Sequence, residues 1–201
     1  MPPGRRSRPA KQRVRASVQR ILDAMTDAPA LVQNARLDIF AANRLGYAVY
    51  SEMDLAPGRP ANHARFVFLD PRAKRFFLDW DRVADDTVAM LRAEAGRDPH
   101  DRDLTDLVGA LSTRSQDFRV RWAAHNVRFH RTGVKRLHHP IVGELQLSYE
   151  TMTIDADDGL SMACTPWKPG SASQRALDLL ASWTAAPEVR ETPPDGGVRP
   201  Q

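Results

Sequence analysis

The clearest alternation of hydrophobic and polar residues lies between Val134 and Ile154. From position 145 to 149 every second residue is apolar, and this period of two is typical of a strand with one buried face. Proline and glycine favour turns, so Pro140 and Gly143 mark a turn between two strands. We therefore predict an antiparallel hairpin with strands over residues 135–139 and 144–152.

Shorter strand patterns occur on both sides of this hairpin. Two short strands are expected within residues 30–42, with a turn between them. Alternation from Val127 to His130 predicts the beginning of a further strand, and Gly133 is expected to mark a bulge or turn before the hairpin. A last strand is predicted over residues 160–167, after a turn at residues 155–159.

The helical spacing of apolar residues predicts the remaining elements. Asn43 and Ser115 are suited to cap helices, because their side chains accept a hydrogen bond from a backbone N–H of the first turn. Asp70 followed by Pro71 is expected to begin a helix, with proline at the first helical position. The predicted helices cover residues 14–25, 44–53, 80–95, a stretch through Leu104 and Leu111, a stretch carrying Phe118 and Trp122, and a closing stretch from Ala176 to Trp183.

The order of these elements defines the expected fold class. One helix and two strands come first, several helices follow, and three long strands and a last helix complete the chain. This is an α+β arrangement, with a mainly antiparallel sheet of about five strands covered by helices on one side. A long helical insertion lies between the second and third strands. This connectivity is that of a PAS-like sensor fold.

The composition indicates a soluble protein of a reducing compartment. Hydrophobic residues make up 42% of the 201 residues, which is enough for a core, and no apolar run approaches the length of a membrane span. Cys164 is the single cysteine, so an internal disulfide is excluded and a cytoplasmic location is expected. The charged N-terminal stretch lacks the apolar segment that a signal peptide requires.

The positive charge is concentrated at the N-terminus. Of the 29 Lys and Arg residues, seven precede the first acidic residue, Asp23. We expect residues 1–12 to form a basic flexible linker, residues 13–185 the folded domain and residues 186–201, which are rich in proline and glycine, a disordered tail. The basic arm either contacts nucleic acid phosphates or is a solvated linker.

Several ordered segments resemble the ligand-binding domain of MmyB-like transcription regulators. The resemblance covers roughly residues 12–184, and it rests on the order of the segments more than on any one of them. The segments are Arg13–Leu22, Pro29–Val32 with Leu37–Asn43, Phe68–Pro71 with Asp79 and Trp80, Leu91–Gly96, Trp122–His125, Lys135 and Arg136 with His139–Glu144, and Leu147–Glu150.

The resemblance implies a PAS-like domain that follows an XRE-type helix-turn-helix DNA-binding domain in bacterial regulators. It also implies a small, fatty-acid-like ligand in an internal pocket, whose binding changes how the DNA-binding domain engages its operator. That domain would precede residue 1, so the sequence is expected to be either a fragment of a regulator or a stand-alone relative. Regulators of this type commonly bind paired half-sites, so a homodimer is a further expectation.

An acyl-chain pocket needs apolar walls and one or two polar groups at its mouth. Arginine suits a carboxylate head group because its fork of donors matches the carboxylate oxygens. The alternative for the aromatic residues is that they fill the core. Candidates for the walls are Phe66, Phe68, Phe76, Phe77, Trp80, Met90, Trp122, Leu147, Tyr149 and Met152, and candidates for the head group are Arg65, Arg136, His138 and Tyr149.

Other kinds of site have little support in the sequence. His138 and His139 are neighbours on a predicted strand, so their side chains point to opposite faces and cannot chelate one metal, and Cys164 has no partner cysteine. No phosphate-binding glycine loop, dinucleotide fingerprint or Gly-x-Ser-x-Gly motif occurs. We therefore expect no metal, no other cofactor and no enzymatic activity. The alternative to ligand sensing is a dimerisation or protein-interaction module without a small-molecule ligand.

Overall fold

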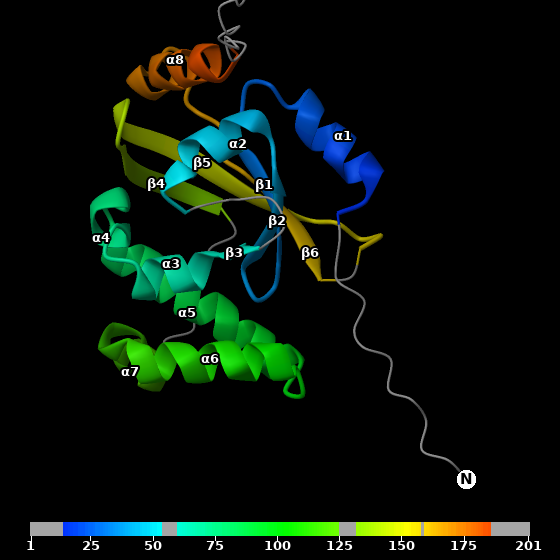
Figure 1. The fold of residues 1–201 in the computed structure, drawn as a ribbon, viewed down its shortest axis with the longest axis vertical. Helices are drawn as coiled ribbons and strands as arrows, with labels where there is room; N and C mark the ends of the chain where they lie inside the picture. The colour runs from blue at the N-terminus through cyan, green and yellow to red at the C-terminus, as the bar shows by residue number, and fades with distance from the viewer. Residues whose placement is uncertain (1–13, 54–59, 125–131, 158, 186–201) are drawn as a thin grey trace, which may run out of the picture.

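A computed structural model of the protein describes residues 14–53, 60–124, 132–157 and 159–185 (Figure 1). The predictions for residues 1–12, 127–130 and 186–201 lie outside these described residues. The helices are α1 (Ala16–Ala24), α2 (Arg44–Val49), a 3-10 turn at Ser51–Met53, α3 (His63–Leu69), α4 (Ala73–Phe76), α5 (Trp80–Arg97), α6 (Arg102–Arg114), α7 (Gln116–Ala123) and α8 (Ala172–Ala185). The strands are β1 (Ala30–Asn34), β2 (Asp38–Ala42), β3 (Ala61–Asn62), β4 (Thr132–His139), β5 (Gly143–Thr153) and β6 (Leu160–Cys164).

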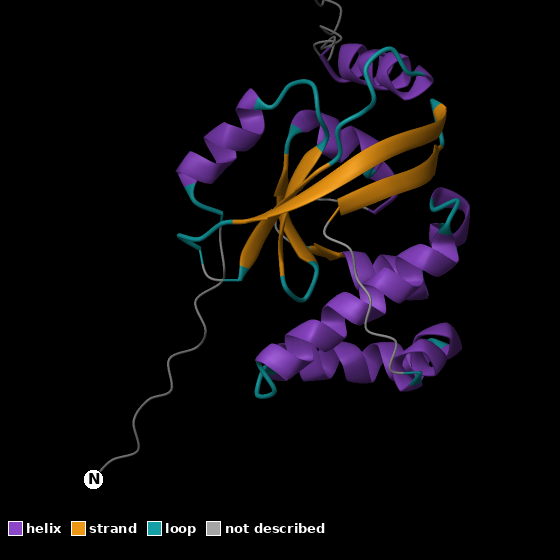
Figure 2. Ribbon diagram, turned by 180° about the vertical axis from the view of Figure 1, so that it is seen from behind, coloured by secondary structure: helices purple, strands orange, loops and turns teal. Residues whose placement is uncertain are grey.

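The strands form one antiparallel sheet (Figure 2), and their order in it is β3-β2-β1-β6-β5-β4. The predicted hairpin is confirmed as β4 and β5, which pair from Thr132 opposite Glu150 to His139 opposite Gly143. The helical insertion is also confirmed, because α3 to α7 all lie between β3 and β4. The α+β class is therefore confirmed. The sheet has one strand more than expected, since a two-residue strand, β3, pairs with β2.

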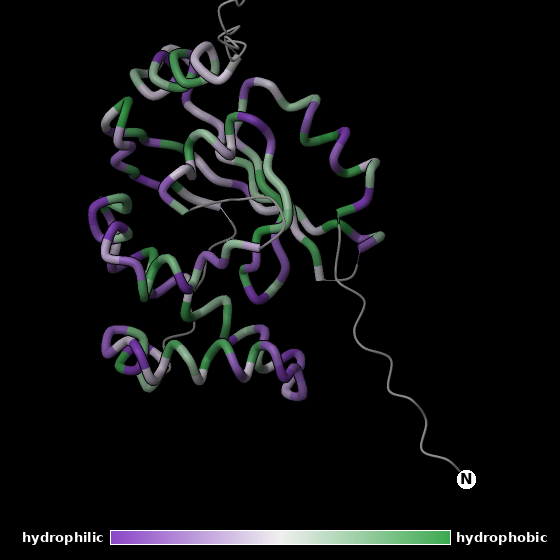
Figure 3. The backbone as a smooth tube through the Cα atoms, in the orientation of Figure 1, coloured by the Kyte–Doolittle hydropathy of each residue, from purple (hydrophilic) through white to green (hydrophobic). Residues whose placement is uncertain are grey.

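The central strands are buried on both faces. Leu31 on β1 lies opposite Ala163 on β6, and both pack in the main core with α2, α3, α4 and α8. We call this the inner face of the sheet and the opposite one the outer face. On the outer face, Val32 and Met162 pack against Leu22 of α1. Figure 3 shows the hydrophobic residues concentrated along these strands at the centre of the domain.

The prediction that the helices gather on one side of the sheet is wrong. Val18 and Leu22 of α1 are buried against the outer face of β1 and β6, away from the helices of the insertion (Figure 1). The physical reason is that β1 is apolar at consecutive positions, so both of its faces have to be covered by other elements.

None of the described helices is long and apolar enough to cross a membrane.

The predicted helix start at Pro71 is also wrong. Helix α3 ends at Leu69, α4 begins at Ala73, and Pro71 lies in the turn between them. Proline disfavours helical backbone in the preceding residue, and Asp70 is extended with φ −102° and ψ 123°. The Asp70 carboxylate then accepts a 2.9 Å hydrogen bond from the backbone N–H of Arg72 and closes the turn.

Gly133 lies inside β4 and does not mark a bulge or turn before it. It pairs with Tyr149 across the hairpin. A Cβ atom at this position would come within 2.8 Å of the Tyr149 ring, so only glycine leaves enough room for the ring.

The two predicted helix caps are confirmed: the backbone N–H of Gly46 donates to Asn43 at 2.7 Å, and that of Phe118 donates to Ser115 at 3.1 Å.

Candidate functional site

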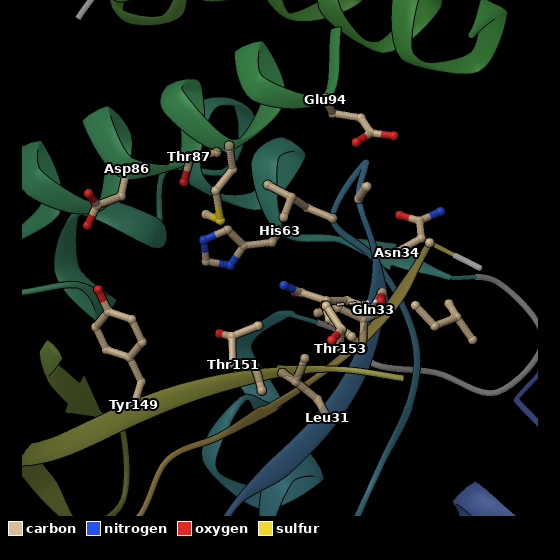
Figure 4. Close-up of a pocket in the computed structure, with 18 of the residues that line it drawn as sticks. Leu31, Gln33, Asn34, His63, Asp86, Thr87, Glu94, Tyr149, Thr151 and Thr153 are labelled. Atoms are coloured by element: carbon tan, nitrogen blue, oxygen red, sulfur yellow. Dashed lines mark hydrogen bonds between the residues drawn. The ribbon is translucent and has the colours of Figure 1, made fainter. Parts of the chain in front are cut away.

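A cavity of about 530 Å³ lies between α5 and the inner face of the sheet. Its volume is within the range of small-molecule sites. In Figure 4, Asp86, Thr87 and Glu94 project from α5 on one side, and Tyr149, Thr151 and Thr153 project from β5 on the other. His63, the first residue of α3, lies between these two walls.

The cavity exists because small side chains occupy the middle of the inner face. Along β5 the inner positions hold Leu145 and Leu147, then Tyr149, and then Thr151. The two leucines fill the core beneath α4 and α8, whereas Thr151 lies opposite Ala163 of β6 and leaves space above the sheet. The same change from large to small side chains along one strand therefore separates the packed core from the open cavity.

The lining is aliphatic with interspersed hydroxyl and amide groups. Met90 is supplied by α5, and Tyr50 and Met53 come from the segment after α2. Thr87 is fully buried, and its hydroxyl donates a 2.6 Å hydrogen bond to the carbonyl of Val83. The other apolar lining residues include Leu31, Ala35, Leu37, Ile39, Val83, Ala93, Ile154, Leu160 and Ala163, and the other uncharged polar ones include Gln33, Asn34, Thr151, Thr153 and Ser161.

Charged groups gather around Tyr149 at one end of the cavity. The Lys135 ammonium lies 5.0 Å from the centre of the Tyr149 ring, in a cation–π contact. Burial and the negative charge of Asp86 raise the pKa of Tyr149, while Arg82 opposes them, so the phenol stays protonated at neutral pH. Within the described part of the chain, Lys135 makes no ion pair with a carboxylate.

The position of His63 is fixed from several sides. Its backbone N–H donates to the carbonyl of Leu37 at 2.9 Å, and its ring makes an edge contact with Phe77 at 5.7 Å between centroids. Burial, assisted by the positive charge of Lys135, lowers the pKa of His63 to about 3. Part of the ring surface is nevertheless accessible, and it faces the cavity (Figure 4). The imidazole is therefore neutral at physiological pH.

The low pKa of His63 predicts acid-sensitive stability. The unfolded chain binds a proton at His63 near pH 6.5, while the folded chain does so near pH 3. The contribution of His63 to the free energy of unfolding should therefore be complete above pH 6.5. It should decrease between pH 6.5 and pH 3, by up to about 1.4 kcal/mol per pH unit. Urea unfolding at pH 7 and pH 5 measures this slope.

A His63→Leu variant should have a shallower slope than the unchanged protein. Burial also lowers the pKa of His139, so part of the slope remains in this variant. Equal slopes for His63→Leu and the unchanged protein would contradict this assignment.

Most of the aromatic candidates lie in the packed core and not around the cavity. Phe66 makes edge contacts with Phe76 at 5.9 Å and with Phe77 at 6.0 Å. Phe118 stacks on Trp122 at 5.4 Å, in a separate cluster beneath α5 and α6. The candidates Phe66, Phe68, Phe76, Phe77, Trp80, Trp122 and Leu147 all pack in these clusters, whereas Tyr149 and Met90 line the cavity.

The head-group candidates other than Tyr149 also lie away from the cavity. Arg136 and His138 share one face of β4, as predicted, and that face is exposed. Arg136 forms an ion pair with Asp79 at 3.3 Å. Arg65 lies over a smaller surface hollow with Asp103 and Asp106, and Met152 is exposed on the outer face of β5. The structure therefore does not bring these residues together with Tyr149.

His63, Lys135 and Thr151 were missed in the sequence, although alternation contains a signal for two of them. Leu137 is the apolar residue of the first hairpin strand, and period two places Lys135 on its face. The same period continues the face of Tyr149 to Thr151 and Thr153. No sequence pattern indicated His63, because its approach to the cavity depends on how α3 packs against the sheet.

The residues considered as metal ligands in the sequence can also be placed. The side chains of His138 and His139 point to opposite faces: His138 is exposed, and His139 is buried with Nε2 3.0 Å from the carbonyl oxygen of Ala48. Cys164 packs under α1, and burial raises the pKa of its thiol. Among the residues that the structure describes, no three His, Cys, Asp or Glu side chains are grouped to hold a metal ion.

An α+β domain with a largely apolar cavity beside its sheet is the architecture of a domain that holds a small molecule. The chain belongs to the family described as MmyB-like transcription regulator ligand binding domain, which matches it over residues 14–180. It is therefore a ligand-sensing regulatory domain of transcription regulators. A search of curated proteins found no match.

Proposed function

We propose that the cavity between α5 and the sheet binds a fatty-acid-like molecule and that the bound molecule controls an attached DNA-binding domain. The observation that supports this most is the cavity itself, with a volume of about 530 Å³ and a lining that includes aliphatic side chains such as Met90 and Ala163. An alkyl chain gains free energy by leaving water for such walls. Lys135 offers a positive charge for a carboxylate at the end marked by Tyr149.

The attached domain would be an XRE-type helix-turn-helix domain joined through the basic arm, and the protein would act in the cytoplasm. The order of β1, β2 and the two-residue strand β3, then a helical insertion and three further strands, supports the PAS-like interpretation of the fold. We propose binding and not catalysis for this cavity.

The outer helix α1 offers a route from the cavity towards the N-terminal arm. Ile154 and Leu160 line the cavity and also pack in the cluster that holds Val18 and Leu22 of α1. Arg15, directly before α1, forms an ion pair with Asp157 at 2.7 Å in the turn between β5 and β6. A ligand that fills this end would bias the packing of α1 and so shift the population of its states.

This route predicts a change in hydrogen exchange at α1. Adding dodecanoate should slow amide exchange in Ala16–Ala24 several-fold, because a filled cavity supports Ile154 and Leu160 from the inside. Helix α7, Gln116–Ala123, is the internal control and should be unaffected. Bound dodecanoate without any change at α1 would contradict the route but not the binding site.

Mass spectrometry of the freshly purified protein tests the proposed function. Under native conditions we expect an additional mass of a small apolar molecule that is released by organic solvent, or uptake of dodecanoate by the ligand-free protein. A ligand-free mass with no uptake from a panel of saturated fatty acids from eight to eighteen carbons would refute the proposal.

A protein-interaction role is the second candidate. Tyr47 on α2 and Leu179 and Trp183 on α8 are large, exposed apolar residues, and the two helices are neighbours. Exposed apolar groups of this kind favour contact with another protein or a second copy of the chain. Light scattering after size-exclusion chromatography measures whether the protein is a dimer, and the Trp183→Ser variant is the comparison. A dimer that this variant dissociates supports the interaction role.

A further inference from the structure

His63 has hydrogen-bonding capacity that the protein does not use. A neutral imidazole has one donor and one acceptor nitrogen. Among the described residues, no backbone or side-chain group hydrogen-bonds either ring nitrogen of His63, which is partly accessible from the cavity. Neither ring nitrogen is among the buried unpaired atoms of the described residues, so water reaches them through the cavity, and a ligand that displaces this water has to replace its hydrogen bonds.

The wall of the cavity that faces His63 from the sheet carries uncharged hydrogen-bonding groups. In Figure 4 the ring lies between Asp86 and Glu94 along α5, with Gln33, Thr151 and Thr153 on the opposite wall. Glu94 pairs with Arg97 at 2.8 Å. Gln33, Thr151 and Thr153 therefore form a band of neutral hydrogen-bonding groups across the cavity from His63, while the charge of Lys135 is near enough to lower the pKa of His63.

We propose that this band recognises an uncharged oxygen part-way along the ligand, so that the preferred ligands are hydroxy- or oxo-acyl chains and His63 is a specificity-determining residue. The inference rests on the proposed acyl-chain site and names the class of ligand more narrowly. With a carboxylate near Lys135, the oxygen would lie several carbons along the chain, where His63 Nδ1 or Nε2 can donate to it or accept from it.

The physical argument is one of desolvation. In the ligand-free cavity water can hydrogen-bond His63 and Thr151. A plain alkyl chain displaces that water and leaves the ring nitrogens unpaired, which weakens its binding, whereas a hydroxyl or keto group replaces the lost hydrogen bonds. Sites that hydrogen-bond a ligand oxygen discriminate strongly against the analogue that lacks it. The low pKa of His63 supports a neutral partner, because protonating the ring to meet an anion is unfavourable here.

Calorimetric titration with dodecanoate and with 3-hydroxy-, 6-hydroxy-, 6-oxo- and 12-hydroxydodecanoate tests the inference. We expect at least one oxygenated chain to bind the unchanged protein about tenfold or more tightly than dodecanoate. In His63→Leu, which removes the ring nitrogens, this preference should disappear while dodecanoate still binds as well or better. His138→Leu, at an exposed position on β4, should retain the preference. Melting temperatures of all three proteins confirm that the fold is kept.

Two results overturn the inference in different ways. If dodecanoate binds and no oxygenated chain binds more tightly, or if His63→Leu keeps the preference, the band is not a specificity site and the proposed function stands. If neither dodecanoate nor any oxygenated chain binds, the proposed function fails together with the inference.

Discussion

The Thr151→Trp variant is expected to lose about a hundredfold or more in affinity for dodecanoate while keeping its fold. Thr151 lies on the inner face of β5, opposite Ala163, and its side chain enters the cavity (Figure 4). An indole at this position fills the space that the alkyl chain needs. A hundredfold loss corresponds to about 2.8 kcal/mol, which is within the range of steric exclusion by an overpacked side chain.

Met152→Trp is the matched control for this variant. Met152 is the next residue along β5, points to the outer face and is 47% exposed. The same substitution there adds the same indole without entering the cavity, so dodecanoate affinity should stay within about threefold of the unchanged protein. Fluorescence or calorimetric titration measures both variants. Tight binding by a folded Thr151→Trp variant would place the ligand elsewhere.

Phe76→Ala is expected to lower the free energy of unfolding by about 3–5 kcal/mol, the usual effect of removing a buried aromatic ring. Phe76 is 1% exposed and contacts the rings of Tyr50, Phe66 and Phe77. Because it lies in the packed core and not at the cavity, its removal should act on stability and leave the dodecanoate affinity of the folded protein within a few-fold. Urea unfolding and titration at low temperature measure the two effects separately.

Ile141→Ala is the control for stability, since Ile141 lies in the β4–β5 turn and is 60% exposed. Its free energy of unfolding should change by no more than about 0.5 kcal/mol. A Phe76→Ala variant that unfolds like the unchanged protein but loses dodecanoate would show that the aromatic cluster is a binding wall after all.

The sequence predicts most of the strands because alternation is a local property. The β4–β5 hairpin, the β5–β6 turn and the caps at Asn43 and Ser115 each depend on neighbouring residues, and each is found in the structure. Errors arise where distant packing decides. Helix α1 covers the outer face because both faces of β1 are apolar, which becomes clear only when β1 is known to be central in the sheet.

The cavity was harder to predict for a related reason. Aromatic residues suit both a core and a ligand wall, and their sequence spacing does not distinguish the two. The structure places Phe66, Phe76 and Phe77 against one another and opens its cavity above Thr151 and Ala163, where the side chains are small. A cavity is space that side chains leave unfilled. Whether such space remains depends on how several strands and helices pack together, and no single segment of the sequence determines it.

Amide chemical-shift mapping with dodecanoate tests the central claim that the ligand occupies the cavity between α5 and the inner face of the sheet. We expect the largest shifts at His63, Thr87, Thr151 and Ala163, which come from α3, α5, β5 and β6 and meet only at this cavity. Shifts confined to Phe118, Trp122 and their neighbours in α6 and α7, with the cavity residues unchanged, would contradict the claim.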